Sequence, residues 1–136
     1  MLTTLKHKGA GTVPSTDKRS KQVRIGNKEI KAKQGNWLAD VMWDDGRKAT
    51  LPTAHRRFFN AGTKRYEHDN TGMLKNPRKL QAWKEAIVEH GAVVMTDDDW
   101  IGNTPKRAGY YGVFAITDLK LETQGSNHSF TVTRWL

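Results

Sequence analysis

Apolar and polar residues alternate in two stretches that precede residue 52, and both stretches predict antiparallel hairpins. In the first, residues 22–33, the alternation continues on either side of Gly26-Asn27, which is a two-residue turn signal, and it predicts a short edge hairpin. In the second, Trp37 and Val41 share one face of a strand and Asp40 lies on the other.

The second strand turns at Asp45-Gly46, a pair that tolerates the positive φ of a tight turn. This turn is expected to set Asp44 opposite Arg47 on the return strand. The return strand is expected to end at Pro52.

Residues 77–90 carry the clearest helical pattern. Asn76 is a good N-cap, Pro77 suits the first turn, and Gly91 fits just past the end. Apolar residues recur at helical spacing and predict one buried stripe, made of Leu80, Trp83, Ile87 and Val88. The helix is therefore expected to pack through this stripe, with the tryptophan in the core.

The rest of the chain alternates strands with loops. Residues 55–73 have no clean period and predict a loop, with a helical turn within residues 53–59. The segments that follow the helix are a buried strand, a long loop, a long strand and a returning strand, at 92–95, 96–109, 109–122 and 128–136. The fold class is therefore α+β, mostly β: a small antiparallel β-barrel or curled sheet of six or seven strands, with one main helix at about 77–90 across one opening.

Composition indicates one basic domain without disulfides. The chain has 136 residues, which fits one domain, and no cysteine, which excludes thiolate metal sites and favours an intracellular setting. Residues 1–21 have few apolar groups and predict a flexible basic arm before a single domain at 22–136. No apolar run approaches the ~20 residues of a membrane span, so we expect a cytoplasmic or nucleoid-associated protein with no membrane partner.

The charge is unevenly distributed along the chain. The net charge is +9. Residues 1–35 carry nine Lys and Arg against two acids, and residues 47–84 carry ten against two. Two basic blocks among mildly acidic segments are typical of proteins that meet a polyanion, although a basic protein with no nucleic-acid role has the same composition.

Basic residues alternate with aromatic residues in the second block, and a flexible arm and a tryptophan-bearing loop add to them. Cationic side chains neutralise phosphates, and bases stack on aromatic rings. Tyr66 or Trp100 is expected to stack on a base, whereas Phe58 and Phe59 are expected in the core. The predicted nucleic-acid-binding residues are Arg47, Lys48, Arg56, Arg57, Lys64, Arg65, Tyr66, Trp100, Lys106, Arg107, Lys18, Arg19, Lys21 and Arg24.

Two stretches resemble known barrels. VMWDDGRKATLP, residues 41–52, resembles the W-x-D-G hairpin of Tudor-like and other SH3-like barrels. GYYGVFAITDLKLE, residues 109–122, together with the strand that returns after it, is similar in pattern to PUA-like and EVE-like nucleic-acid-binding domains. Both resemblances imply a small β-barrel that binds RNA or modified DNA. No aromatic cage accompanies the hairpin, so binding of methylated lysine or arginine is not implied.

Two groups of residues were weighed as catalytic or metal sites. Asp97–Asp99 could hold Mg²⁺ or Ca²⁺, but the run lacks calcium-loop spacing, and a solvated turn explains it as well. His55, Asn60 and His68 suggest an HNH nuclease, but their spacings are too short and zinc would need a third ligand. We therefore expect no cofactor, no metal and no catalytic residue.

The sequence thus predicts a non-catalytic nucleic-acid-binding domain, with DNA and RNA both open as partners. The alternative is a protein-interaction module or small inhibitor, of a phage or mobile-element type, that binds an acidic surface of a larger machine. A metal-dependent nuclease that uses Asp97–Asp99 or the histidines is the third possibility.

Overall fold

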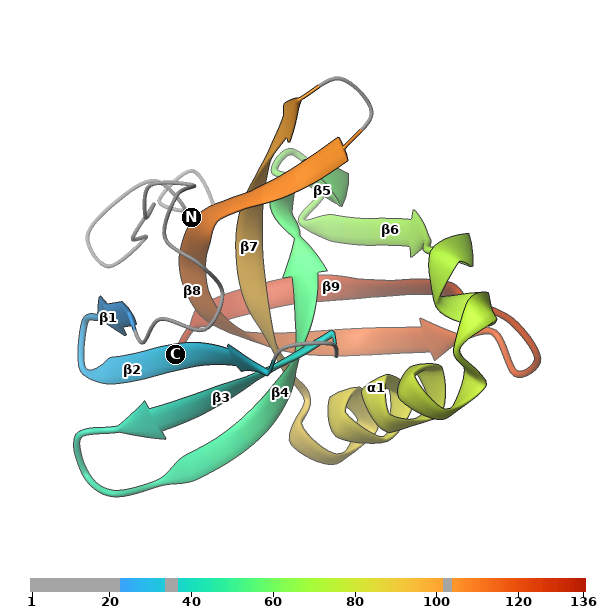
Figure 1. The fold of residues 1–136 in the computed structure, drawn as a ribbon. Helices are drawn as coiled ribbons and strands as arrows, with labels where there is room; N and C mark the ends of the chain where they lie inside the picture. The colour runs from blue at the N-terminus through green and yellow to red at the C-terminus, as the bar shows by residue number, and fades with distance from the viewer. Residues whose placement is uncertain (1–22, 34–36, 102–103) are drawn as a thin grey trace.

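The computed structural model describes residues 23–33, 37–101 and 104–136, and it describes the side chains of these residues except for residues 97–108. Figure 1 labels the helix and the strands along the chain. The elements are β1 (Val23–Ile25), β2 (Lys28–Lys33), β3 (Leu38–Trp43), β4 (Lys48–His55), the 3-10 turn η2 (Arg56–Phe58), β5 (Phe59–Asn60), β6 (Arg65–Asp69), the 3-10 turn η3 (Thr71–Lys75), α1 (Pro77–His90), β7 (Ala92–Ile101), β8 (Thr104–Leu121) and β9 (Asn127–Trp135).

The strands form one curled sheet that does not close into a barrel. Neighbouring strands follow the order β1-β2-β3-β4-β7-β8-β9-β6-β5, so β1 and β5 lie at its two edges. Neighbours are antiparallel except for β4 and β7, which run parallel over Thr53–His55. The predicted class, mostly β with one main helix, is confirmed, although the described residues form nine strands where six or seven were expected.

Helix α1 begins and ends where the sequence predicts. The side chain of Asn76 accepts a hydrogen bond from the backbone N–H of Lys79, and Gly91 ends the helix in the left-handed conformation with φ 57°. Leu80, Trp83 and Ile87 are buried, as expected. Val88 was expected in the same stripe but is 64% exposed. It follows Ile87 directly, so helical geometry turns it about 100° away from the buried stripe.

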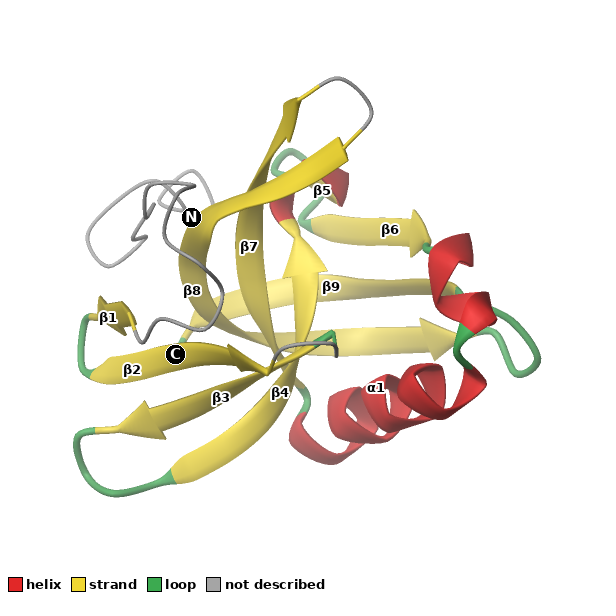
Figure 2. Cartoon of the chain, viewed as in Figure 1, coloured by secondary structure: helices red, strands yellow, loops and turns green. Residues whose placement is uncertain are grey.

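The sheet has a hydrophobic core on each side of β7. Val93 and Met95 belong to the core that contains α1, whereas Ala92 and Val94 belong to the core beneath β1–β4. A strand that is buried on both faces needs a continuous apolar run, which explains the AVVM sequence. Figure 2 shows α1 to the right of β4 and the hairpins of β1–β3 to its left.

The hairpin between β3 and β4 forms, but its register differs by one residue from the prediction. The backbone N–H of Trp43 donates to the carbonyl of Arg47 at 2.9 Å, so Trp43 rather than Asp44 faces Arg47. Gly46 is the last residue of the loop. Its φ is 94°, and its backbone N–H donates a hydrogen bond to the carbonyl of Trp43. A three-residue loop with glycine at the positive-φ position is a common alternative to the two-residue loop.

Strand β4 does not end at Pro52. The strand pairs with β3 up to Pro52 and then pairs with β7 from Thr53 onward. Proline cannot donate a backbone hydrogen bond, and it is tolerated here because β4 changes partner at this point. Pro52 thus marks the boundary between two parts of one strand.

Residues 55–73 are more ordered than expected. The predicted helical turn is present as η2, but the residues after it form the β5–β6 hairpin, which pairs with β9. The side chain of Asn60 accepts hydrogen bonds from the backbone N–H groups of Gly62 and Thr63 and so fixes the turn between β5 and β6.

The predicted loop at 96–109 is also a hairpin. Strands β7 and β8 continue through it, and the backbone register places Asp98 opposite Arg107 and Asp99 opposite Lys106. The run of three aspartates therefore lies within β7 and not in a solvated turn.

Candidate nucleic-acid interface

The structure separates the predicted basic residues into two regions. Arg47 and Lys48 lie at the start of β4, whereas Arg56 and Arg57 follow its last residue. A strand rises about 3.3 Å per residue, so the two pairs lie on the order of 25 Å apart. The segment from Arg47 to Arg65 is therefore not one continuous patch.

At the far end of β4 the cations contact aromatic rings and one acid. The guanidinium of Arg56 lies 4.7 Å from the ring centre of Tyr111, and that of Arg57 lies 5.5 Å from Phe58. Arg65 forms an ion pair with Asp118 at 2.9 Å, which neutralises its charge. Arg57 and Lys64 are the exposed members of this group, whereas Arg56 and Arg65 are partly buried.

Tyr66 cannot stack on a base, contrary to the sequence-based expectation. Its side chain is 1% exposed, and its ring lies parallel to that of Phe130 at 4.6 Å. Its hydroxyl accepts a hydrogen bond from the backbone N–H of His55 at 3.2 Å. The residue faces the core because it alternates with Arg65 and Glu67 along β6, a period-2 pattern that is present in the sequence.

The remaining predicted residues lie on β1, on β7 and β8, or outside the described residues. Arg24 on β1 forms an ion pair with Asp44 at 2.6 Å. Trp100 lies on β7, and its register partner is Pro105; the side chains of Trp100, Lys106 and Arg107 are not among those described. Lys18, Arg19 and Lys21 lie outside the described residues.

A second surface, which carries three lysines and two acids and includes Lys48, lies on the outer face of β2, β3 and β4. Outward side chains alternate with buried ones on these strands. The backbone register aligns Lys31, Asp40 and Thr50 in one row across the strands, and Glu29, Met42 and Lys48 in the next row. We call this surface, together with Lys33, the sheet face.

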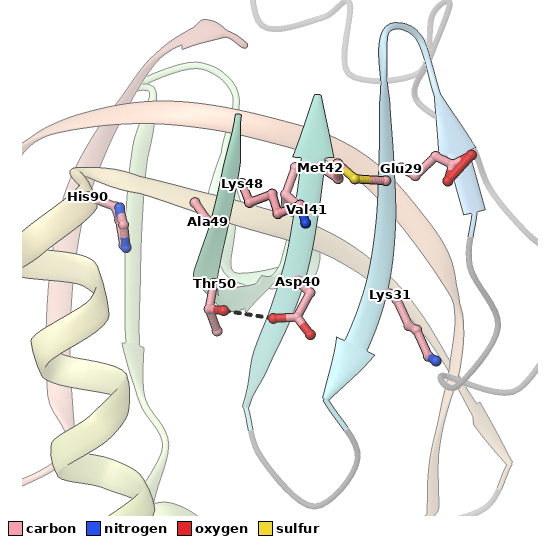
Figure 3. A pocket seen from close by; sticks show the side chains of 9 residues that line it. All are labelled: Glu29, Lys31, Asp40, Val41, Met42, Lys48, Ala49, Thr50 and His90. Carbon is pink, nitrogen blue, oxygen red and sulfur yellow. Dashed lines mark hydrogen bonds between the residues drawn. The ribbon is translucent and has the colours of Figure 1, made fainter. Parts of the chain in front are cut away.

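The sheet face surrounds an open hollow of about 630 Å³. Figure 3 shows that Asp40 and Thr50 point toward one another from neighbouring strands. His90, at the end of α1, closes one side of the hollow. The lining residues are Glu29, Lys31, Asp40, Val41, Met42, Lys48, Ala49, Thr50 and His90.

Within the described residues, the lysines of the sheet face form no ion pair with an acid. In the described part of the chain the ion pairs involve other cations, namely Arg24, Arg47, Arg65 and His90. Lys31, Lys33 and Lys48 take part in none of them, and all three are exposed. Lys31 and Lys33 were not among the predicted binding residues, although they alternate with Ile30 and Ala32 in KEIKAK, a pattern that places both lysines on one outer face.

The histidines weighed for a nuclease lie in an aromatic cluster. His68 stacks on Phe58 with ring centres 3.6 Å apart, and His128, which sequence reasoning missed, lies 5.7 Å from His68. Burial, together with the nearby His128 and His55, lowers the pKa of His68 to about 4. Asn60 is committed to its turn. Among the side chains that the structure describes, no group of three or more His, Asp or Glu could hold a metal ion.

Comparison with protein-family models, with curated proteins and with solved structures gave no match. The resemblances to Tudor-like, SH3-like, PUA-like and EVE-like domains therefore stay predictions. No helix in the described ranges has the length and apolar character to cross a membrane.

Proposed function

We propose that the protein binds nucleic acid without catalysing a reaction on it, and that the sheet face is its main contact surface. The observation that carries this proposal is the set of three exposed lysines, Lys31, Lys33 and Lys48, that share one face and join no ion pair within the described residues. An ammonium group that no carboxylate neutralises can pair with a phosphate and release its counterions.

The place of the basic residues 18–21 in the sequence supports the same surface. Lys18, Arg19 and Lys21 directly precede β1 in the sequence, and β1 pairs with β2, the strand that carries two of the three lysines. The net charge of +9 adds long-range attraction to any polyanion. Contacts to phosphates from the arm and from the sheet face would therefore be neighbours along one bound strand.

A single strand suits this surface better than a duplex. The outer side of α1 carries both signs of charge, with Arg78 and Lys84 beside Glu85 and Glu89. It therefore lacks the basic character of a helix that enters a groove. An open sheet face with a hollow instead leaves room for unpaired nucleotides, which the lysines would hold through phosphate contacts because no Phe, Tyr or Trp is among the described residues that line the hollow.

A protein partner with an acidic surface is the second candidate. The observation that favours it is Met42, which is 41% exposed and lies between Glu29 and Lys48 on the sheet face; methionine is enriched at protein interfaces. This candidate predicts that a partner stays bound to the protein after nuclease treatment. It also predicts that the partner is lost when the three lysines are changed.

The first test compares two triple variants in fluorescence-anisotropy binding to labelled single strands and duplexes of DNA and RNA. The sheet-face variant is Lys31→Gln with Lys33→Gln and Lys48→Gln. The matched control removes the same charge from exposed cations on η3, α1 and β8, as Lys75→Gln with Arg78→Gln and Lys120→Gln. We expect the sheet-face variant to bind a single strand about ten- to a hundredfold more weakly at about 100 mM salt, and the control about threefold at most.

Two results would contradict the proposal in different ways. Equal weakening by both triple variants would show that only net charge matters and that the sheet face is not the site. A wild-type protein that binds none of the four nucleic acids would remove the nucleic-acid function itself.

A further inference from the structure

Asp40 is an acid in the middle of the basic sheet face. It is exposed, it borders the hollow, and its register partners are Lys31 on β2 and Thr50 on β4. Within the described residues it forms no ion pair with either Lys31 or Lys48. A surface that met phosphates alone would gain from replacing this carboxylate, because the carboxylate repels them.

Thr50 fixes the orientation of the carboxylate. Its hydroxyl donates a hydrogen bond to Oδ1 of Asp40 at 2.7 Å, which Figure 3 marks with a dashed line. An ionised carboxylate has about four lone-pair positions and donates nothing. Asp40 can therefore accept further hydrogen bonds from a ligand that presents two adjacent donors.

Among the nucleobases, guanine presents two adjacent donors, N1–H and the N2 amino group, on its pairing edge. The pairing edges of adenine and cytosine set an acceptor nitrogen beside the amino group, and uracil has one N–H between two carbonyls, so each would turn an acceptor toward the carboxylate. In a duplex the edge of guanine is occupied by its pairing partner, whereas in a single strand it is open.

We propose that the hollow is a binding site for an unpaired guanine. The Asp40 carboxylate accepts from N1–H and from the N2 amino group, and Met42 contacts the base. Lys31 and Lys48 neutralise the phosphates on either side. The volume of about 630 Å³ lies within the roughly 300–1,000 Å³ of small-ligand sites. This inference rests on the proposed function, because it names the base that the same surface selects.

The test uses single strands of uracil, in both ribose and deoxyribose forms, that carry one central guanine, one inosine or no substitution. Inosine lacks only the N2 amino group of guanine. We expect the wild-type protein to bind the guanine strand about tenfold more tightly than the inosine strand, since a hydrogen bond to a charged group is lost. Asp40→Asn should abolish this preference, because asparagine presents a donor where guanine also presents one.

The matched control is Glu85→Gln, which removes one negative charge from the outer side of α1 and should keep the guanine preference. Asp40→Asn should still bind the all-uracil strand at least as tightly as the wild type, because it has lost a repulsive charge. Equal binding of all three strands by the wild type, or a preference that survives in Asp40→Asn, would overturn the inference while leaving the proposed function intact. Failure of the wild type to bind any strand would overturn both.

Discussion

The surroundings of His68 lower the pKa of its imidazole. Its imidazole lies on the inner side of β6, stacked on Phe58, with His55 and His128 nearby. Burial disfavours the charged form, and two further imidazoles add to the effect. The pKa of His128 is also lowered, chiefly by burial, while the carbonyl of Ser126 that accepts from its Nδ1–H raises it. His68 is therefore uncharged at neutral pH.

This arrangement predicts a loss of stability in mild acid. The unfolded chain takes up a proton on His68 near pH 6.5, whereas the folded chain does so only near pH 4. The folded state therefore keeps its full stability with respect to His68 above about pH 6.5, and it loses stability as the pH falls from there toward 4. We expect the free energy of unfolding to drop by about 1–2 kcal/mol across this range from His68, after allowance for the half-exposed position of the ring.

Urea unfolding at several pH values checks this prediction. His68→Gln should lose less stability between neutral pH and about pH 4 than the wild type does, and His90→Gln, which changes an exposed histidine, should lose as much as the wild type. An equal loss in wild type and His68→Gln would show that other groups cause the acid sensitivity.

At the scale of elements, β8 connects the two cores. It pairs with β7 on one side and with β9 on the other, and the β7–β8 pairing shifts register next to Met95, the partner of Gly112. Gly112 has φ 144°, a conformation that other residues rarely adopt. A Cβ there would lie 3.0 Å from the ring of Trp135, which packs against both cores. The strand therefore depends on glycine at this position.

Gly112→Ala is expected to lower the free energy of unfolding by about 1–3 kcal/mol, because the alanine is strained and crowds Trp135. Gly72→Ala is the matched control, since its Cβ would meet only the side-chain oxygen of Asn70 at 3.4 Å and its φ is not positive. Urea denaturation compares the two variants. If Gly112→Ala were no less stable than Gly72→Ala, the close approach to Trp135 would not hold in solution.

At the scale of the whole molecule, periodic patterns could be predicted and changes of strand partner could not. The alternation that buries Ile30 and Val41 and the caps at Asn76 and Gly91 are local, so they are visible in the sequence. The partner change of β4 at Pro52 depends on β7, which lies about forty residues away. That change carries Arg56 away from Lys48 and divides the predicted basic patch. It is a tertiary effect with no local signal.

The sequence could predict which residues of the candidate site point outward, but not which of them form ion pairs. Lys48 was identified from the sequence, and the outward positions of Lys31 and Lys33 follow from a pattern that was already recognised. The alternation of residues along a strand does not show which cations form ion pairs with acids. Asp45, Asp44 and Asp118 pair with arginines that the sequence marked as phosphate contacts. The lysines remained available because no acid in the described residues pairs with them.

The measurement that tests the central claim most directly is the salt dependence of binding to a single strand. The affinity of the wild-type protein for a single strand should fall steeply as the salt concentration rises. The sheet-face triple variant should reduce the slope of log K against log[salt] by about 2, because each lysine–phosphate contact contributes roughly 0.7 on single strands. The control triple variant should leave the slope unchanged. A slope that is the same for wild type and the sheet-face variant would contradict the claim that these lysines meet the phosphates.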